Sequence, residues 1–279
     1  MQEAVIKRAK ELLADGTVNR VVGWKAGEFA YDTTPAVFTS AEELDAGFIY
    51  NDFCAPNLSK YLVKESRKEG KLLVFLKPCD TYSFNQLLKE HRILRDNVYI
   101  IGVECTGKVD ADTVKSKGIK GITGMESDGE TVTIHTLYGD KTMPKTETLG
   151  DKCKTCKSKK HVIFDEMIGN DGEVNTDGAR FELVEKLEAM TPDERYNFWR
   201  GELSKCIRCN ACRDICPACS CEQCIFDKPD TSVAGKAYAD EVEEQMYHII
   251  RAFHVAGRCT GCGECARVCP QGIHLELLN

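Results

Sequence analysis

The sequence lacks several features that would assign it to common classes of protein. Lys and Arg (37) are outnumbered by Asp and Glu (44), and no basic patch alternates with aromatic residues, so we expect no nucleic-acid partner. Long apolar runs are also missing: residues 1–16 mix acidic with apolar side chains, which fits neither a signal peptide nor a membrane anchor. The composition therefore predicts a cytoplasmic protein without a membrane span.

Two further absences concern catalysis. No Gly-x-Gly-x-x-Gly segment follows a predicted strand, so a nicotinamide site of the Rossmann type is not expected. The six histidines are scattered, and none pairs with a carboxylate or a cysteine at a spacing that suggests nucleophilic catalysis. We therefore assign no catalytic residue.

Cysteine, in contrast, is abundant. Sixteen cysteines in a reducing cytoplasm cannot be a disulfide scaffold, and they indicate metal or cluster ligands. A chain of 279 residues also exceeds the usual size of one core, which favours two compact units joined by a linker.

The first half of the sequence predicts an α/β arrangement. The apolar run at 72–76 reads as a buried strand, a helix capped by Asp80 follows, and 97–103 reads as a second buried strand. A hairpin is predicted at 118–137 as an antiparallel addition to the same sheet. Helices are also predicted over 1–15, 58–68, 179–203 and 236–256, the last with an apolar face of Val242, Met246, Ile249, Ile250 and Phe253.

Two runs near the C-terminus share one strict spacing, Cys-x2-Cys-x2-Cys-x3-Cys-Pro. It is the run of bacterial ferredoxins, in which three cysteines hold one [4Fe–4S] cluster and the fourth reaches across to the other. The predicted ligand sets therefore interleave. The first cluster takes Cys206, Cys209, Cys212 and Cys269, and the second takes Cys259, Cys262, Cys265 and Cys216.

Zinc is the alternative for these runs, but zinc sites use two Cys-x2-Cys pairs and need neither the third cysteine nor the Cys-Pro. Four arginines in or beside the runs could raise the cluster potentials by offsetting negative charge, or could simply form a solvated basic face; they are Arg208, Arg213, Arg258 and Arg267.

Eight cysteines lie outside the two runs. Cys79 and Cys105 follow the two buried strands, and Cys153-x2-Cys156 lies in a later loop, so these four thiols could meet at one sheet edge. Individually, Cys79 and Cys105 are more typical of core cysteines. The other four remain open between a further cluster or zinc site and plain thiols; they are Cys54, Cys219, Cys221 and Cys224.

Three segments carry a resemblance to a known family. Lys77-Pro78-Cys79-Asp80 comes first, then Ile101-Gly102-Val103-Glu104-Cys105-Thr106-Gly107, then Cys153-Lys154-Thr155-Cys156. In this order they resemble the beta-subunit family of deazaflavin-reducing hydrogenases and formate dehydrogenases, over about residues 15–175. The resemblance implies FAD beside a third [4Fe–4S] cluster, with ligand candidates at Cys79, Cys105, Cys153 and Cys156.

The chain departs from the better-known members of that family because its double-cluster module lies at the C-terminus. The predicted fold class is thus α/β or α+β, with a mixed-sheet flavin-type domain and a ferredoxin-like domain. Predicted boundaries are 1–178 for the first domain, 179–204 for a helical linker, and 205–279 for the second domain with its inserted helix.

Together these patterns predict an iron–sulfur flavoprotein subunit that moves electrons between FAD and a catalytic oxidoreductase subunit. The hydride donor is left open between a deazaflavin, a nicotinamide and no soluble donor at all. Lys77, Asp80 and Thr81, at a strand end and helix start, are the predicted flavin contacts. Five lysines around the Cys153 pair could stabilise a reduced centre or dock an acidic partner, or could be solvated; they are Lys152, Lys154, Lys157, Lys159 and Lys160. The rival hypothesis is a flavin-free, polyferredoxin-like adaptor.

Overall fold

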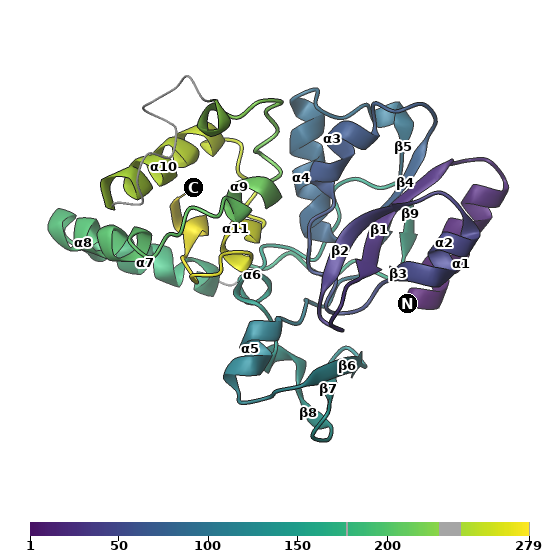
Figure 1. The fold of residues 1–279 in the computed structure, drawn as a ribbon, viewed down its shortest axis with the longest axis horizontal. Helices are drawn as coiled ribbons and strands as arrows, with labels where there is room; N and C mark the ends of the chain where they lie inside the picture. Colours follow the sequence, from purple (N-terminus) through teal and green to yellow (C-terminus); the bar gives the residue numbers. More distant parts are fainter. Residues whose placement is uncertain (177, 229–240, 279) are drawn as a thin grey trace. The chain divides into compact units, whose positions relative to one another are not determined.

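The computed structural model describes residues 1–176, 178–228 and 241–278, and the chain divides into two compact units (Figure 1). The first unit is Met1–Asn175 and the second is Thr176–Asn279. The helical segment predicted as a linker, 179–204, is counted within the second unit.

The first unit is built on a six-stranded mixed sheet with the path β2-β1-β4-β5-β9 and β3 beside β1. Its strands are β1 (Arg20–Ala26), β2 (Thr33–Phe38), β3 (Phe48–Ile49), β4 (Leu72–Leu76), β5 (Val98–Val103) and β9 (Glu166–Ile168). The neighbours β1, β4, β5 and β9 run parallel, whereas β2 and β3 pair with β1 antiparallel. Parallel strands end at the same sheet edge, which later positions the cysteines.

The β4-α4-β5 unit matches its prediction. All five residues of β4 are buried, as expected for a central strand of a parallel sheet. Helix α4 (Pro78–Lys89) has Pro78 in its first turn and Lys77 at the N-cap. Asp80 lies at the third helical position rather than at the cap, and its carboxylate accepts a hydrogen bond from the Lys77 backbone N–H at 3.2 Å. The cap is thus made by the predicted residue from a different position.

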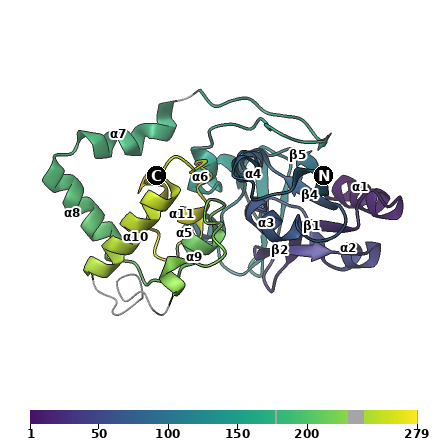
Figure 2. The same cartoon turned by 90° about the horizontal axis from the view of Figure 1, so that it is seen from above.

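Helices cover both faces of this sheet. Helices α1 (Gln2–Ala14) and α2 (Ala41–Gly47) lie on one face, and α3 (Leu62–Glu65) and α4 lie on the other (Figures 1 and 2). The predicted helix over 58–68 is shorter, because a 3-10 turn at Ser59–Tyr61 precedes the single turn of α3. The buried core between the layers includes Trp24, Phe75 and Phe84.

The predicted hairpin forms, but its assignment to the main sheet is wrong. β6 (Ile122–Ser127), β7 (Thr131–Thr136) and β8 (Lys141–Pro144) make a separate three-stranded antiparallel sheet. This small sheet packs with α5 (Ala111–Ser116) around a second core that contains Val114, Val132 and Ile134. Hydrophobic patterning fixes which face of a hairpin is buried but not the surface against which it packs, and that explains the error.

The second unit is helical. Its helices are α7 (Glu182–Ala189), α8 (Pro192–Leu203), α9 (Ala211–Ile215), α10 (Glu241–Val255) and α11 (Glu264–Arg267). Helix α8 begins with the predicted capping box, since Thr191 and Glu194 exchange hydrogen bonds around Pro192. In the part of the chain that the structure describes, no helix has the length and apolarity needed to cross a membrane.

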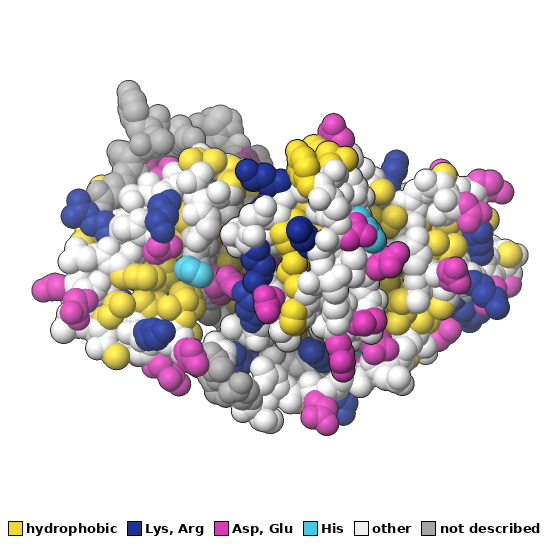
Figure 3. Space-filling model, turned by 90° about the horizontal axis from the view of Figure 1, so that it is seen from below, with side chains coloured by type: hydrophobic (Ala, Val, Ile, Leu, Met, Phe, Trp, Pro, Cys, Tyr) yellow, Lys and Arg dark blue, Asp and Glu magenta, His cyan; other side chains and the backbone are white. Residues whose placement is uncertain are grey.

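The predicted apolar face of α10 is wrong in orientation. Val242 is 69% exposed and Phe253 is 76% exposed, and Met246 and Ile249 are exposed as well. The face that packs inward instead carries Tyr247 with three polar side chains, Glu244, His248 and Arg251. Figure 3 shows hydrophobic side chains (yellow) at the molecular surface. A helix can bury polar side chains where other polar groups bind them. Here Glu244 pairs with Arg208 and Arg251 donates to Cys212, and both of these partners belong to the first cysteine run.

Candidate metal centres

The two cysteine runs fold into loops with the same backbone. Arg208 and Asn210 in the first run, and Gly261 and Gly263 in the second, all have left-handed conformations, with φ of 54°, 64°, 64° and 68°. Each pair stands two and four residues after the first cysteine of its run. In the first loop the backbone N–H of Arg208 donates to Cys206 Sγ at 3.3 Å. In the second loop the backbone N–H of Gly261 donates to Cys259 Sγ at 3.4 Å in the same way.

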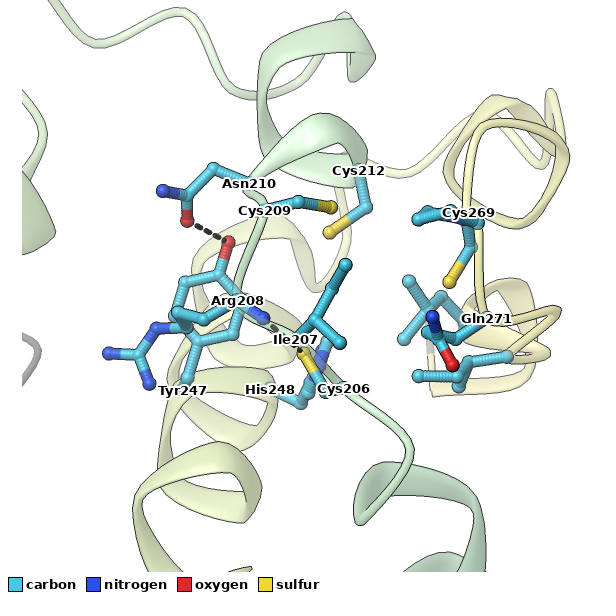
Figure 4. Close-up of a pocket in the computed structure, with 13 residues that line it drawn as sticks. Cys206, Ile207, Arg208, Cys209, Asn210, Cys212, Tyr247, His248, Cys269 and Gln271 are labelled. Carbon is cyan, nitrogen blue, oxygen red and sulfur yellow. Dashed lines mark hydrogen bonds between the residues drawn. The ribbon is translucent and has the colours of Figure 1, made fainter. Parts of the chain in front are cut away.

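The first predicted ligand set converges on one pocket. Cys206, Cys209 and Cys212 of the first run line it, and Cys269 of the second run faces them from the other side (Figure 4). The structure therefore brings together four cysteines that the repeat rule, and not sequence proximity, assigns to one cluster. Burial raises the pKa of the Cys206 thiol to about 12 and also raises that of Cys212.

Buried polar atoms around this pocket fit a cluster. Both ring nitrogens of His248 are buried and, among the described residues, have no hydrogen-bond partner. Burial and the charges of Arg251 and Arg208 lower the pKa of His248 to about 3, so its imidazole is neutral and carries one N–H donor. A [4Fe–4S] cluster offers sulfur acceptors to such a donor. Tyr247, which also lines the pocket, donates its hydroxyl to Asn210 Oδ1 at 3.0 Å (Figure 4).

The second predicted set is also drawn together. Burial raises the pKa of Cys265 well above its ordinary value, and the neighbouring thiols Cys262 and Cys216 raise it further. A hydrogen bond from Cys219 lowers the pKa of Cys216 to about 6 despite burial. Three members of the set are therefore electrostatic neighbours, while Cys259 lies exposed in its loop.

The part of the chain that the structure describes gives no support for a site with a single metal ion. In it, no group of three or more Cys, His, Asp or Glu side chains is arranged to hold one ion. Four thiolates around one zinc lie about 3.8 Å apart, because each Zn–S bond is about 2.3 Å. A [4Fe–4S] cluster holds its four cysteine thiolates further apart, because the four irons lie between them. The open ring of cysteines around the first pocket fits the cluster better than the ion.

Four cysteines of the first unit lie near the carboxyl edge of the parallel strands, and their grouping as ligands of one cluster stays a prediction. Cys79 lies in the first turn of α4, Cys105 follows β5, and Cys153 is in α6 (Asp151–Lys154). Cys105 interacts electrostatically with both Cys79 and Cys153, and Cys156 interacts with Cys153. Burial is the main cause that raises the pKa of Cys79 and Cys153, so these thiols lie away from water.

Sequence reasoning missed a group of buried charges beside these cysteines. Lys108 is 3% exposed; its backbone N–H donates to Cys153 Sγ at 3.4 Å, and its ammonium lies 4.3 Å from the centre of the Tyr50 ring. Asp52 pairs with Lys108 at 3.4 Å and with the equally buried Lys145 at 2.5 Å. Pairs this distant in sequence leave no local pattern, although Lys108 follows the Cys105 motif closely.

The predicted flavin contacts are buried at the start of α4. Lys77, Asp80 and Thr81 are at most 1% exposed. The Lys77 ammonium donates to the Pro56 carbonyl, pairs with Asp80 at 2.9 Å and lies over the Trp24 ring. Thr81 donates to the Pro78 carbonyl and accepts from the Val162 N–H. These contacts hold the start of α4 and its neighbours together.

The other cysteines and lysines singled out from the sequence differ in burial. Cys54 is fully buried in the main core of the first unit, and Cys221 is exposed in the second. Of the five lysines near the Cys153 pair, Lys152 donates to the Ala55 carbonyl and lies near Cys79 and Cys153. Lys157 lies 4.0 Å from the centre of the Tyr82 ring, whereas the other three, Lys154, Lys159 and Lys160, are exposed.

Comparison with known proteins bears on both units. Residues 202–273 match the family described as "4Fe-4S dicluster domain". Across 99% of its length, the chain is 26% identical to a protein from Methanocaldococcus jannaschii named "F420-dependent formate dehydrogenase subunit beta", of which it covers 86%. The chain resembles formate dehydrogenase beta subunits. A second such subunit, from Methanococcus maripaludis, is 28% identical over 91% of this chain and 80% of its own length.

The similarity to these beta subunits confirms the resemblance predicted from the three N-terminal motifs, and the match over 202–273 confirms the C-terminal dicluster domain. The mixed α/β fold is confirmed as well. A chain of the F420-reducing [NiFe] hydrogenase complex from Methanosarcina barkeri superposes with a TM-score of 0.44 at 14% identity, covering 74% of this chain and 90% of that one. A likeness at this level decides nothing about the present chain.

Proposed function

We propose that this chain is the iron–sulfur electron-transfer subunit of an F420-dependent formate dehydrogenase or a related oxidoreductase complex. One observation carries the proposal: cysteines from two separate runs, Cys206, Cys209 and Cys212 with Cys269, line one pocket in the arrangement that a two-cluster module requires. Electrons pass between the two clusters of this module and a partner subunit. The names of the two methanogen relatives support formate dehydrogenase as the complex.

The first unit adds a third [4Fe–4S] cluster in this proposal. Cys79, Cys105, Cys153 and Cys156 would hold it, and the buried Lys108 and the half-buried Lys152 lie beside it. Cations at this position favour the reduced, more negative cluster. Their placement makes the site suited to accepting an electron.

FAD belongs to the proposal through the family resemblance. Bound flavin would supply the exchange between a two-electron hydride and single electrons. Lys77, Asp80 and Thr81 stay the predicted flavin contacts, although all three are buried and hydrogen-bonded within the chain. The hydride donor or acceptor proposed for the complex is a deazaflavin, with a nicotinamide as the competing candidate.

Iron and flavin content of the anaerobically purified chain test the proposal. We expect about twelve irons, and Cys153→Ser should lose about four of them because a cluster needs all its ligands. Cys221→Ser is the matched control, since this cysteine is exposed and outside every proposed set. About eight irons in both Cys153→Ser and the unchanged chain, with no flavin released by acid, would favour the flavin-free adaptor instead.

A second experiment tests the donor. The chain, combined with its catalytic subunit, is offered reduced deazaflavin and NADH or NADPH side by side, and cluster reduction is followed by absorbance. Reduction by deazaflavin alone is the expected result. Reduction by a nicotinamide alone, or by neither, would contradict the F420-dependent assignment while leaving the clusters in place.

A further inference from the structure

The inward face of α10 brings one cation to the cysteine runs that the sequence did not single out. Arg251 is 6% exposed. Its Nη1 donates to Cys212 Sγ at 3.2 Å, and its Nη2 donates to the Cys212 carbonyl at 3.3 Å. The guanidinium is therefore anchored on a proposed ligand of the first cluster, both through the thiol and through the backbone.

The same guanidinium also faces the second ligand set. It interacts electrostatically with Cys265, which belongs to that set, and with Cys219, which hydrogen-bonds to Cys216. Cys212 and Tyr247 belong to the small core of this unit, and Cys265 packs against that core. One buried charge thus acts on cysteines of both sets.

Arg251 differs from the arginines that the sequence pointed to. Arg208 pairs with Glu244, Arg213 with Asp214 and Asp227, and Arg267 with Glu264, so a carboxylate offsets each of these charges. Arg258 donates to the carbonyl of His254 on the surface. Within the described residues Arg251 pairs with no carboxylate, and its Nε is buried without a hydrogen-bond partner.

We propose that Arg251 is a shared cation between the two clusters that raises the reduction potential of both, and most strongly that of the cluster bound by Cys212. The inference rests on the proposed function, because it needs both clusters. Reduction adds one electron to a cluster, while Arg251 keeps its charge and no bond is made or broken. A buried positive charge stabilises the added negative charge more than an exposed one does.

Redox titration of the full chain, followed by electron paramagnetic resonance, tests this role. Arg251→Gln should lower both midpoint potentials, and the Cys212 cluster should lose at least tenfold in its preference for the reduced state, about 59 mV for one electron. Arg213→Gln is the matched control, and we expect a smaller shift because two carboxylates already offset its charge. The Cys269→Ser variant assigns the signals, since it lacks a ligand of the first cluster.

Each outcome bears on a separate claim. Unchanged potentials in Arg251→Gln with full iron content would overturn the role of Arg251 and leave the proposed function standing. Fewer than about eight irons in the unchanged chain would contradict the proposed function itself. If Arg251→Gln loses a cluster, Arg251→Lys and Arg251→Met decide: Lys keeps the charge and should keep both potentials near those of the unchanged chain, whereas Met removes it and should lower both. Equal potentials in these two variants would reject the inference.

Discussion

Single side chains in the first unit show how charge is placed beside the cysteines. Asp52 lies between the ammonium groups of Lys108 and Lys145, which are both 3% exposed. Burial tends to raise the pKa of Asp52, but the two lysines outweigh burial and hold it below its ordinary value. The carboxylate is thus the counter-ion that allows two cations to be buried next to Cys105 and Cys153.

Replacing this counter-ion should be costly. Asp52→Asn leaves two buried ammonium groups without their carboxylate, and we expect unfolding to become easier by about 3–5 kcal/mol. Asp112→Asn is the control, because Asp112 is 89% exposed and its pair with Lys115 contributes about 0–1 kcal/mol. Anaerobic denaturant titrations of the two variants measure the difference. Equal stability of the two would show that Asp52 is not needed as a counter-ion.

A second residue gives a pH prediction. Burial tends to raise the pKa of Asp171, but hydrogen bonds from the His161 ring and backbone N–H outweigh it and hold the pKa below 3.8. Because the pKa of Asp171 is lower in the folded chain, the ionised carboxylate stabilises the fold fully above pH 3.8. This stabilisation is lost only as the pH falls through the folded pKa. We expect Asp171→Asn to destabilise the chain by about 1 kcal/mol.

That loss should not shrink from about pH 8 to about pH 5, because the carboxylate remains ionised throughout. Denaturant titrations of Asp171→Asn and the unchanged chain at several pH values measure it. A difference that already shrinks above about pH 5 would contradict the depressed pKa.

At the scale of elements, close packing inside the sheet gives a third prediction. A Cβ at Gly102 in β5 would stand 2.2 Å from Met167 Sδ in β9, so Gly102→Ala should destabilise the chain by about 1–3 kcal/mol. Gly201 in the interior of α8 has nothing within 4 Å of the same added atom. Gly201→Ala should therefore stabilise the chain, by about 0.5–1 kcal/mol. Thermal unfolding of both variants shows whether the signs differ as expected.

Elements with a clear local signal were predictable from the sequence. The run Leu72–Leu76 and the box Thr191-Pro192-Asp193-Glu194 each contain the residues that determine their structure, and both form as predicted. Helix α10 was not predictable in this way. Its apolar residues dominate the pattern, but Tyr247, His248 and Arg251 are the buried ones, because this face packs on the cysteine loops and on the small core with Leu203, Ile273 and Leu275.

The same distinction holds for the candidate sites. The ring of Cys206, Cys209, Cys212 and Cys269 followed from the spacing rule of a repeat, which carries three-dimensional information. Lys108 and Arg251 followed from no rule, because their partners are set by packing between distant segments. The partners of the predicted flavin contacts were also not visible in the sequence, because Lys77 and Thr81 bind Pro56 and Val162, which lie far from them in the chain.

At the scale of the whole molecule, the two units differ in what stabilises them. The first has an extensive apolar core on its main sheet, whereas the described core of the second consists of Leu203, Cys212, Tyr247, Ile273 and Leu275. A core of that size contributes little on its own, so cluster binding should supply much of the folding free energy of the second unit.

Removing iron should therefore affect the units unequally. After anaerobic chelation, we expect the second unit to lose helix and to become sensitive to protease, while the first keeps its sheet. Circular dichroism and limited proteolysis check this, and a resistant fragment ending near Asn175 is the expected product. Cleavage spread evenly over both units, or an unchanged helical signal, would contradict the prediction.

The meeting of Cys269 with Cys206, Cys209 and Cys212 also has a consequence for how the protein is made. A newly synthesised first run holds only three of the four proposed ligands of its cluster, and its own fourth cysteine, Cys216, is reserved for the other. The second cluster can be completed only after the ribosome has passed Cys265, and the first only after it has passed Cys269. Cluster delivery by the assembly machinery must then wait for both runs, which makes the module mature in one step rather than one centre at a time.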